Sequence, residues 1–313
     1  MNPLSLDPKQ FRIVAHLDMD CFYCQVEHLR LNIPVSEPLA VQQWDTVIAV
    51  NYAARASPYS IKRGMKADEC KRRCPNIHLI HVEVIGSTGS PESKVKKVNR
   101  GLTKVSLERY RVASGKIMSI IHDNCHTFQR TSIDEAYLDV TEQSNTHQER
   151  ENFDESEYMT TTDGSLIDSS SIFNQMLINA SIFVLKLRKL IYQELGYTVS
   201  AGIACNKMLA KQASAYYKPN RQTLVPMQFI NSMLSQTKIK DLRGFGGKLG
   251  HQIMDWCNLT YAQELQRFSK EALAEKFGSK TAEHIYRLCR GLDDEPVQPN
   301  VKPKSLLTFK SFR

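Results

Sequence analysis

The chain has 313 residues, of which 42% are hydrophobic and 24% charged, so it is long enough for two or three folding units with buried cores. This composition excludes a disordered tail, and the lack of any run of about 18 apolar residues excludes a membrane-spanning helix. The amino terminus has neither a basic start nor an apolar stretch, so it predicts no secretory signal. We accordingly expect the eight cysteines to be reduced thiols in a cytosolic or nuclear protein.

The net charge of +8 is unevenly distributed along the chain. Residues 141–171 carry one basic and eight acidic side chains, whereas the rest of the chain has a net charge of +15. A basic surface of that size favours a polyanionic partner, of which nucleic acid is the commonest, and a solvated basic surface is the alternative. The acidic segment contains few large apolar residues, and its composition predicts an inserted, disordered loop.

Strand-like and helix-like patterns alternate through the first two thirds of the chain. The expected strands cover residues 11–18, 38–42, 46–51, 126–131, 135–140, 197–204 and 222–225. The expected helices cover residues 21–31, 66–74, 104–124, 172–195 and 206–216, and a mobile loop rich in glycine, serine and lysine is expected at 86–101. The alternation indicates one α/β sheet domain with an inserted subdomain at about 24–81, followed from about residue 226 by an all-helical second domain.

The first candidate site follows the first expected strand, where the chain turns into a helix. Asp18 would end the strand, and the free amides of Cys21, Phe22 and Tyr23 would form an anion site at the helix start. A metal on Asp18 with phosphates on the amides is a natural pairing, because Mg²⁺ binds one or two carboxylates plus substrate phosphates. The alternative is that Asp18 and Asp20 only cap the helix.

Asp134 and Glu135 form a second acidic pair, between two expected strands. Neighbouring side chains on a regular strand point to opposite faces, so both carboxylates can reach one metal only if the chain turns there. A tight hairpin would place both near Asp18 at a sheet edge. The alternative is an acidic turn in water.

Two basic clusters have the composition of phosphate sites. Tyr52 and Arg55 lie three residues apart at a helix start and share a face, and a guanidinium with a hydroxyl suits phosphate oxygens. Lys207 and Lys211 share a helix face, and Lys218 lies in a proline-bounded loop that enters a strand. For either cluster, a plain solvated basic face is the alternative.

A glycine-rich turn lies in the helical region, where Gly244 and Gly246 flank Phe245 and are followed by Lys248. The glycine–hydrophobe–glycine pattern resembles a helix-hairpin-helix element, whose backbone amides contact a DNA phosphate without reading the sequence. It is neither a Walker loop nor a dinucleotide fingerprint. The alternative is a glycine-rich connection between helices.

The cysteine spacing offers a rival interpretation. The pairs Cys21–Cys24 and Cys70–Cys74 have the form of two halves of a zinc site, or of a redox pair. No His or Cys pair has the spacing of a zinc finger, and we favour buried thiols that act as small hydrophobes.

Together, the order and spacing of these motifs resemble the Y-family of translesion DNA polymerases, and within it the eukaryotic eta type, over about residues 11–305. The matching motifs are 16–22, 48–55, 132–137, 200–203, 206–211, 218–223, 246–250, 289–291 and 296–297. The resemblance implies an α+β fold of the right-hand polymerase type. Its parts would be a ferredoxin-like palm with a mixed or antiparallel sheet (11–23 and 82–225), fingers (24–81) and an all-helical thumb with a helix-hairpin-helix element (226–302).

The resemblance also implies roles for individual residues. Asp18, Asp134 and Glu135, with the Met19 carbonyl, would hold two Mg²⁺ ions, for which Mn²⁺ is an alternative. The residues implied on the incoming dNTP are Cys21, Phe22, Tyr23, Tyr52, Arg55, Arg63 and Lys218, with Tyr23 as the steric gate against ribonucleotides. Gln43 would contact the templating base. The residues implied on the DNA backbone are Lys207, Lys211, Gly244, Gly246 and Lys248.

The implied function is template-directed addition of dNTPs to a primer opposite damaged DNA such as thymine dimers, in the nucleus. The partners would be primer–template DNA and dNTP, with no membrane. Sliding-clamp and ubiquitin-binding motifs of the family are not found in this chain, and residues 303–313 would be a linker into a little-finger domain. Without that domain we expect weak, distributive activity. The alternatives are a catalytically silent DNA-binding fragment and a nucleotide cyclase on a similar palm.

Overall fold

The computed structural model describes residues 11–85, 104–149 and 153–299, which form a mixed α+β structure divided into two compact units. The first unit contains the described residues 11–18, 121–149, 153–194 and 198–299, and the second contains 19–85, 104–120 and 195–197. The loop expected at 86–101 and the linker expected at 303–313 lie outside the described residues.

A five-stranded sheet with the strand order β10-β9-β1-β8-β7 forms the centre of the first unit. Its strands are β1 (Val14–Met19), β7 (Phe128–Arg130), β8 (Glu135–Asp139), β9 (Val199–Ala204) and β10 (Gln222–Leu224). β8 pairs antiparallel with both β1 and β7, whereas β10 pairs parallel with β9. Every residue of β9 is buried, as expected for a strand covered on both faces.

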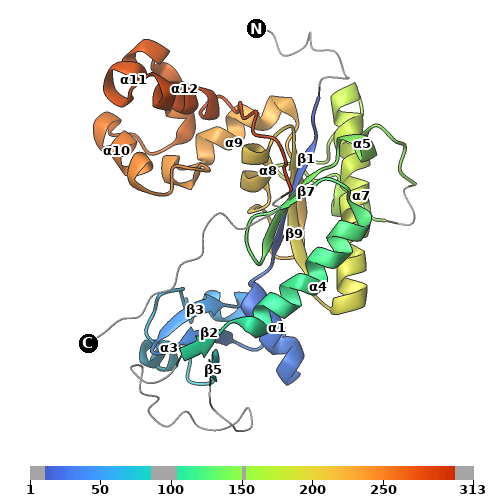
Figure 1. Ribbon diagram of the computed structural model, residues 1–313, viewed down its shortest axis with the longest axis vertical. Helices are drawn as coiled ribbons and strands as arrows, with labels where there is room; N and C mark the ends of the chain where they lie inside the picture. Colours follow the sequence, from blue (N-terminus) through green and yellow to red (C-terminus); the bar gives the residue numbers. More distant parts are fainter. Residues whose placement is uncertain (1–10, 86–103, 150–152, 300–313) are drawn as a thin grey trace. The chain divides into compact units, whose positions relative to one another are not determined.

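Helices α7 (Ile172–Leu195) and α8 (Lys207–Ala213) flank this sheet (Figure 1). α8 begins at Asn206, whose side chain accepts a hydrogen bond from the Leu209 amide. Gly202 lets α8 approach β9, because an added Cβ would lie 2.1 Å from the Ala210 carbonyl oxygen. Among the helices of the described ranges, none is both long and apolar enough to cross a bilayer.

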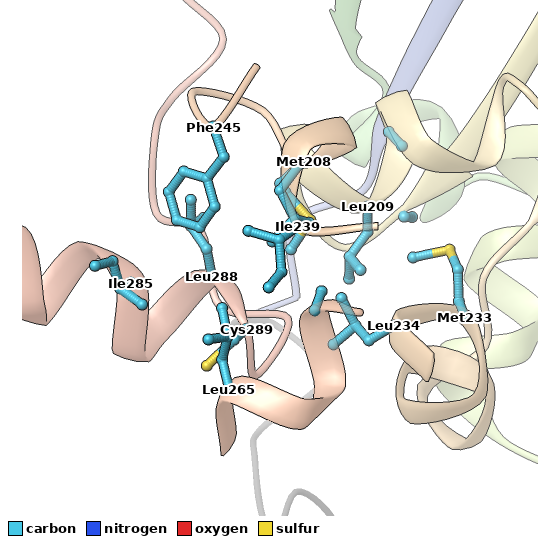
Figure 2. Close-up of a cluster of buried hydrophobic side chains, with 14 of the residues drawn as sticks. Met208, Leu209, Met233, Leu234, Ile239, Phe245, Leu265, Ile285, Leu288 and Cys289 are labelled. Atoms are coloured by element: carbon cyan, nitrogen blue, oxygen red, sulfur yellow. The ribbon is translucent and has the colours of Figure 1, made fainter. Parts of the chain in front are cut away.

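The helical pattern beyond residue 226 is confirmed. The elements are α9 (Ile230–Gln236), α10 (Lys248–Cys257), α11 (Lys270–Phe277) and α12 (Ser279–Leu288), with 3₁₀ turns at Met227–Phe229, Ile239–Asp241 and Ala262–Arg267. Figure 2 shows buried side chains of α8, α9 and α12 around Ile239 and Phe245. The helical region therefore shares a hydrophobic core with α8, and both belong to the first unit.

The second unit contains two smaller sheets and short helices. Its elements are α1 (Phe22–Leu31), β2 (Leu39–Gln43), β3 (Thr46–Val50), α2 (Tyr52–Arg55), α3 (Ala67–Arg73), β4 (His78–His81), β5 (Glu83–Ile85), β6 (Lys104–Ser106) and most of α4 (Glu108–Asn124). β2 pairs antiparallel with β3 and parallel with β4, and β5 pairs antiparallel with β6. Cys70 and Cys74 pack in the hydrophobic cluster of this unit, as small buried hydrophobes.

The expectation of disorder at 141–171 is corrected for the residues that the structure describes there. They form α5 (Thr141–Ser144) and α6 (Glu155–Tyr158), and Thr161 bridges to Leu224 of β10. Tyr158 and Ile167 are buried and anchor the segment. Its acidic side chains accept hydrogen bonds from backbone amides two residues further on, at Asp154, Asp163 and Asp168. Such short-range bonds stabilise turns, so the acidic residues order the segment locally.

Candidate active site

Asp18 and Glu135 lie directly opposite each other on the antiparallel pair β1–β8. Opposed residues of such a pair have Cβ atoms about 4.5–5.5 Å apart and project from the same face, so the two carboxylates emerge side by side. Their side chains are 24% and 26% exposed, so both can be reached by a small ligand. The two strands thus present a pair of carboxylates at one end of the sheet.

The predicted hairpin between β7 and β8 is confirmed, and Asp134 lies in its turn. The Thr131 amide donates to the Glu135 carbonyl at 3.0 Å. Ser132 Oγ donates to Asp134 Oδ1 at 2.5 Å and accepts from the Asp134 amide at 3.1 Å. The Ser132 hydroxyl therefore holds the Asp134 carboxylate in the turn, one position before Glu135 in the chain.

Two lysines of the first unit form ion pairs with the opposed carboxylates. Lys218 Nζ lies 2.7 Å from Asp18 Oδ2, and Lys211 Nζ lies 2.6 Å from Glu135 Oε2. Lys211 extends from α8, and Lys218 from the loop that enters β10. Lys211, expected on the DNA backbone, therefore contacts the acidic centre instead.

His16 is a residue of this centre that the sequence analysis did not single out. It is fully buried, with Nδ1 2.8 Å from Ser214 Oγ and Nε2 3.7 Å from Glu135 Oε2. His16 precedes Asp18 by two positions on β1, so both side chains project from the same face of the sheet. This alternation is the signal that could have identified it.

The surroundings shift the pKa values of the centre in different directions. The His16 imidazole and the Lys211 ammonium lower the pKa of Glu135 to about 2, against the effect of burial. Burial raises the pKa of Asp18, although the Lys218 ammonium opposes that shift. Burial also lowers the pKa of His16. Glu135 is therefore an anion throughout the neutral range, which is the form that binds cations.

The acidic centre offers the kind of oxygen ligands that a magnesium ion binds. Within the described residues, no group of three or more His, Cys, Asp and Glu side chains is arranged to hold a metal ion. Mg²⁺, however, usually takes only one or two carboxylates and completes its octahedron with water and substrate phosphates. The opposed carboxylates of Asp18 and Glu135 meet that requirement, because they offer hard oxygen ligands from two fixed strands.

The residues implied on the triphosphate lie in the second unit, except for Lys218. Cys21 precedes α1 in a left-handed backbone conformation (φ 38°), and Phe22 begins the helix. Tyr52 donates its hydroxyl hydrogen to Asp20 Oδ1 at 3.4 Å, and the Arg55 guanidinium lies 5.2 Å from the centre of the Tyr52 ring. The predicted common face of Tyr52 and Arg55 is thus confirmed.

Three other predicted nucleotide and template residues also lie in the second unit. Tyr23 is half-buried in the first turn of α1, and its ring stacks on that of Tyr110 with centroids 4.0 Å apart and an angle of 9°. Gln43 is half-buried at the end of β2, and Arg63 is exposed between α2 and α3.

The glycine-rich turn of the helical region has a geometry that glycine alone permits. Gly244 has a φ of +88°, and a Cβ on Gly250 would lie 1.8 Å from the Phe245 carbonyl oxygen. Gly246 and Lys248 are exposed at the start of α10. The turn therefore presents backbone amides at a helix start to solvent, as a phosphate contact requires.

Comparison with known proteins identifies the family of the chain. Residues 17–215, more than half of the chain, match the impB/mucB/samB family, and residues 237–292 match the helix-hairpin-helix motif of DNA polymerase eta and Rev1. The chain belongs to the Y-family of DNA polymerases. The second match also confirms the predicted helix-hairpin-helix element, whose glycine-rich turn it contains.

Individual relatives support the same family. The Y-family chain is 34% identical to DNA polymerase eta of Arabidopsis thaliana, over 96% of this chain and 46% of the relative. It is 33% identical to N-acetyltransferase eso1 of Schizosaccharomyces pombe, over 96% of this chain and 37% of the relative. It is 30% identical to human DNA polymerase iota, over 96% of this chain and 38% of the relative. The chain thus spans less than half the length of these three relatives.

Lys207 of this Y-family chain is wholly buried, which corrects its expected place on the DNA backbone. Its ammonium donates to Gln129 Oε1 at 2.7 Å and pairs with Glu295 Oε1 at 2.6 Å. Arg243 Nη2 donates to the same Glu295 oxygen at 2.7 Å. Lys207 therefore ties α8 to the segment after α12, and its ammonium is not available to a phosphate.

Glu295 is expected to contribute a pH-dependent part of the stability. The Arg243 and Lys207 cations lower its pKa from 4.5 to about 2. A carboxyl group whose pKa is lower in the folded protein stabilises the fold at a pH above its pKa in the unfolded chain. That contribution is lost as the pH falls from about 4.5 through about 2. Urea unfolding should therefore show that wild type loses more stability between pH 4.5 and pH 2 than Glu295→Gln does. Glu275→Gln, an exposed change on α11, should lose as much stability as wild type between pH 4.5 and pH 2. Equal losses in all three proteins would contradict the expectation.

Proposed function

We propose that this protein is a template-directed DNA polymerase of the translesion type, which adds dNTPs to a primer 3′-OH opposite damaged template by two-metal nucleotidyl transfer. The observation that carries the proposal is the pair of opposed carboxylates, Asp18 and Glu135, beside Asp134 in a chain of the Y-family. The names of the relatives, which include DNA polymerases eta, iota and IV, support the reaction class.

The proposed architecture is a right hand. The sheet with its antiparallel strands β1, β7 and β8 supports a ferredoxin-like palm at 11–23 and 82–225. The small sheet of β2, β3 and β4 would belong to the fingers (24–81), and the helix-hairpin-helix match supports a thumb at 226–302. A eukaryotic polymerase of this type would act in the nucleus.

Asp18, Asp134 and Glu135, with the Met19 carbonyl, would hold two Mg²⁺ ions, with Mn²⁺ as a substitute. When bound, the ions would lower the pKa of the primer 3′-OH and neutralise the charge of the triphosphate and of the leaving pyrophosphate. Glu135 supplies a charge that does not titrate at neutral pH, because its pKa is about 2.

The lysines beside the carboxylates would respond to the nucleotide. Lys218 carries a mobile ammonium on a flexible stem, which can move from Asp18 to a phosphate oxygen. Tyr52 and Arg55 would bind the triphosphate, the guanidinium by two parallel hydrogen bonds. The amides of Cys21 and Phe22 are the remaining donors proposed for this role.

The other proposed contacts set nucleotide and template position. Tyr23 would exclude a ribose 2′-OH by bulk, whereas Gln43 and Arg63 would contact the templating base and the incoming nucleotide. Gly244, Gly246 and Lys248 would bind the DNA backbone through the exposed helix start without reading its sequence.

Primer extension with Mg²⁺ on undamaged and thymine-dimer templates tests the proposal. We expect nucleotides to be added to the primer on both templates. DNA binding without extension would instead identify a catalytically silent DNA-binding fragment. Conversion of ATP to a cyclic nucleotide without any template would identify a nucleotide cyclase. Either result would overturn the proposed function.

A further inference from the structure

Glu27 is a charged residue buried one helical turn after Tyr23 on α1. Its side chain is 0% exposed, and three other side chains donate hydrogen bonds to its carboxylate. Arg30 Nη2 lies 2.6 Å from Oε2, Arg109 Nη1 lies 2.9 Å from Oε1, and the Tyr110 hydroxyl donates to Oε1 at 2.8 Å. A buried carboxylate is tolerated only when it is paired in this way, so the cluster holds its members in one geometry.

Tyr110 connects this cluster to Tyr23. Its side chain is 1% exposed, its hydroxyl ends on Glu27, and its ring stacks almost parallel on the Tyr23 ring at 4.0 Å. Burial and the Glu27 charge raise the pKa of the Tyr110 hydroxyl far above its ordinary value, so the hydroxyl remains a donor. With its tip bonded and one face covered, the Tyr110 ring has a fixed orientation.

The stacking of Tyr23 on Tyr110 matters because Tyr23 is proposed to exclude ribonucleotides sterically. An aromatic side chain excludes one extra hydroxyl group only if it cannot yield when the larger ligand presses on it. Tyr23 has a neighbouring ring in van der Waals contact, and Glu27 holds that ring through its hydroxyl. Displacement of Tyr23 toward Tyr110 would therefore have to break a charge-assisted hydrogen bond in a buried site.

We infer that Glu27 and Tyr110 are positioning residues that fix the orientation of Tyr23 and thereby increase the preference of the enzyme for deoxyribonucleotides. The inference rests on the proposed polymerase function and on the proposed role of Tyr23. Both residues are buried, so they would act through Tyr23 and not by touching the nucleotide.

The test is the ratio of kcat/KM for a dNTP to kcat/KM for the matching rNTP. Tyr110→Phe keeps the ring and removes only the hydroxyl, and Glu27→Gln keeps the shape and removes the charge. We expect each change to lower the ratio by about two- to tenfold, in line with the weight of one aromatic contact. The double variant should lower the ratio no further than the stronger single change, because both act through one hydrogen bond.

A matched control is Tyr197→Phe, which removes the hydroxyl of a tyrosine whose ring contacts Phe22 instead of Tyr23. Its ratio should equal that of wild type, whereas Tyr23→Ala should give the largest loss. Thermal unfolding shows whether each variant is as stably folded as wild type. A purely structural defect would lower kcat/KM for the dNTP and the rNTP equally and would leave their ratio unchanged.

Extension with an unchanged ratio in Tyr110→Phe would overturn this inference alone. An equal loss for dNTP and rNTP would overturn it as well, and would assign the cluster to folding. If wild type extended no primer at all, the proposed function itself would fail, and the inference with it.

Discussion

Replacement of Glu135 by Gln is expected to lower the rate of primer extension by about 10³-fold or more, while DNA affinity stays within about twofold. The amide keeps the shape of the side chain and loses the charge that pairs with Lys211 at 2.6 Å and that would bind a metal ion. Glu135 lies opposite Asp18 on the neighbouring strand, so its loss leaves Asp18 without the second of the two opposed carboxylates, and Asp18 alone should not compensate. Single-turnover extension and equilibrium DNA binding, measured on the same protein, separate the two effects.

Glu142→Gln is the control for this change, because Glu142 is an exposed glutamate on α5. We expect it to extend primers at the wild-type rate. If Glu135→Gln lost DNA binding in parallel with extension, Glu135 would have a structural role. If it extended primers normally, the assignment of the catalytic centre would be wrong.

Lys207→Ala is expected to lower the free energy of unfolding by about 2–4 kcal/mol. The change removes the buried donor of Glu295 and Gln129 and leaves a cavity beside Tyr137, whose ring centre lies 4.9 Å from the ammonium. Glu295 retains Arg243, which keeps the loss below that of a fully unpaired carboxylate. Urea unfolding monitored by circular dichroism measures the difference.

Lys280→Ala on α12 is the matched control, since its side chain is exposed and surface changes usually stay within about 0.5 kcal/mol. Lys207→Met keeps the volume and should destabilise less than Lys207→Ala. A loss in Lys207→Ala no greater than that of Lys280→Ala would show that the buried Lys207 and its contacts with Glu295 and Gln129 do not stabilise the protein.

Periodicity predicted the elements that position the site. The helix expected at 172–195 is α7, and the expected hairpin after residue 131 brings Glu135 opposite Asp18. These predictions succeed because apolar spacing records which residues face a core, and because two strands joined by a tight turn pair with each other.

The environment of single charged residues could not be predicted in the same way. Helical spacing shows that Lys207 and Lys211 share a face, but not that Lys207 is buried against Glu295, which lies 88 positions later in the chain. Likewise, the charge of the 141–171 segment hides the few apolar side chains, such as Tyr158, that anchor it. In both segments the environment of the residues depends on contacts with residues far away in the sequence, and local sequence patterns carry no information about such contacts.

The most direct test of the central claim is single-nucleotide incorporation opposite each of the four template bases in Mg²⁺, by wild type and by Asp134→Ala/Glu135→Ala. Wild type should add the complementary dNTP at each template base. The double variant should add none and should bind the same DNA with nearly unchanged affinity. Incorporation by wild type that ignores the template base, or equal incorporation by both proteins, would contradict the account.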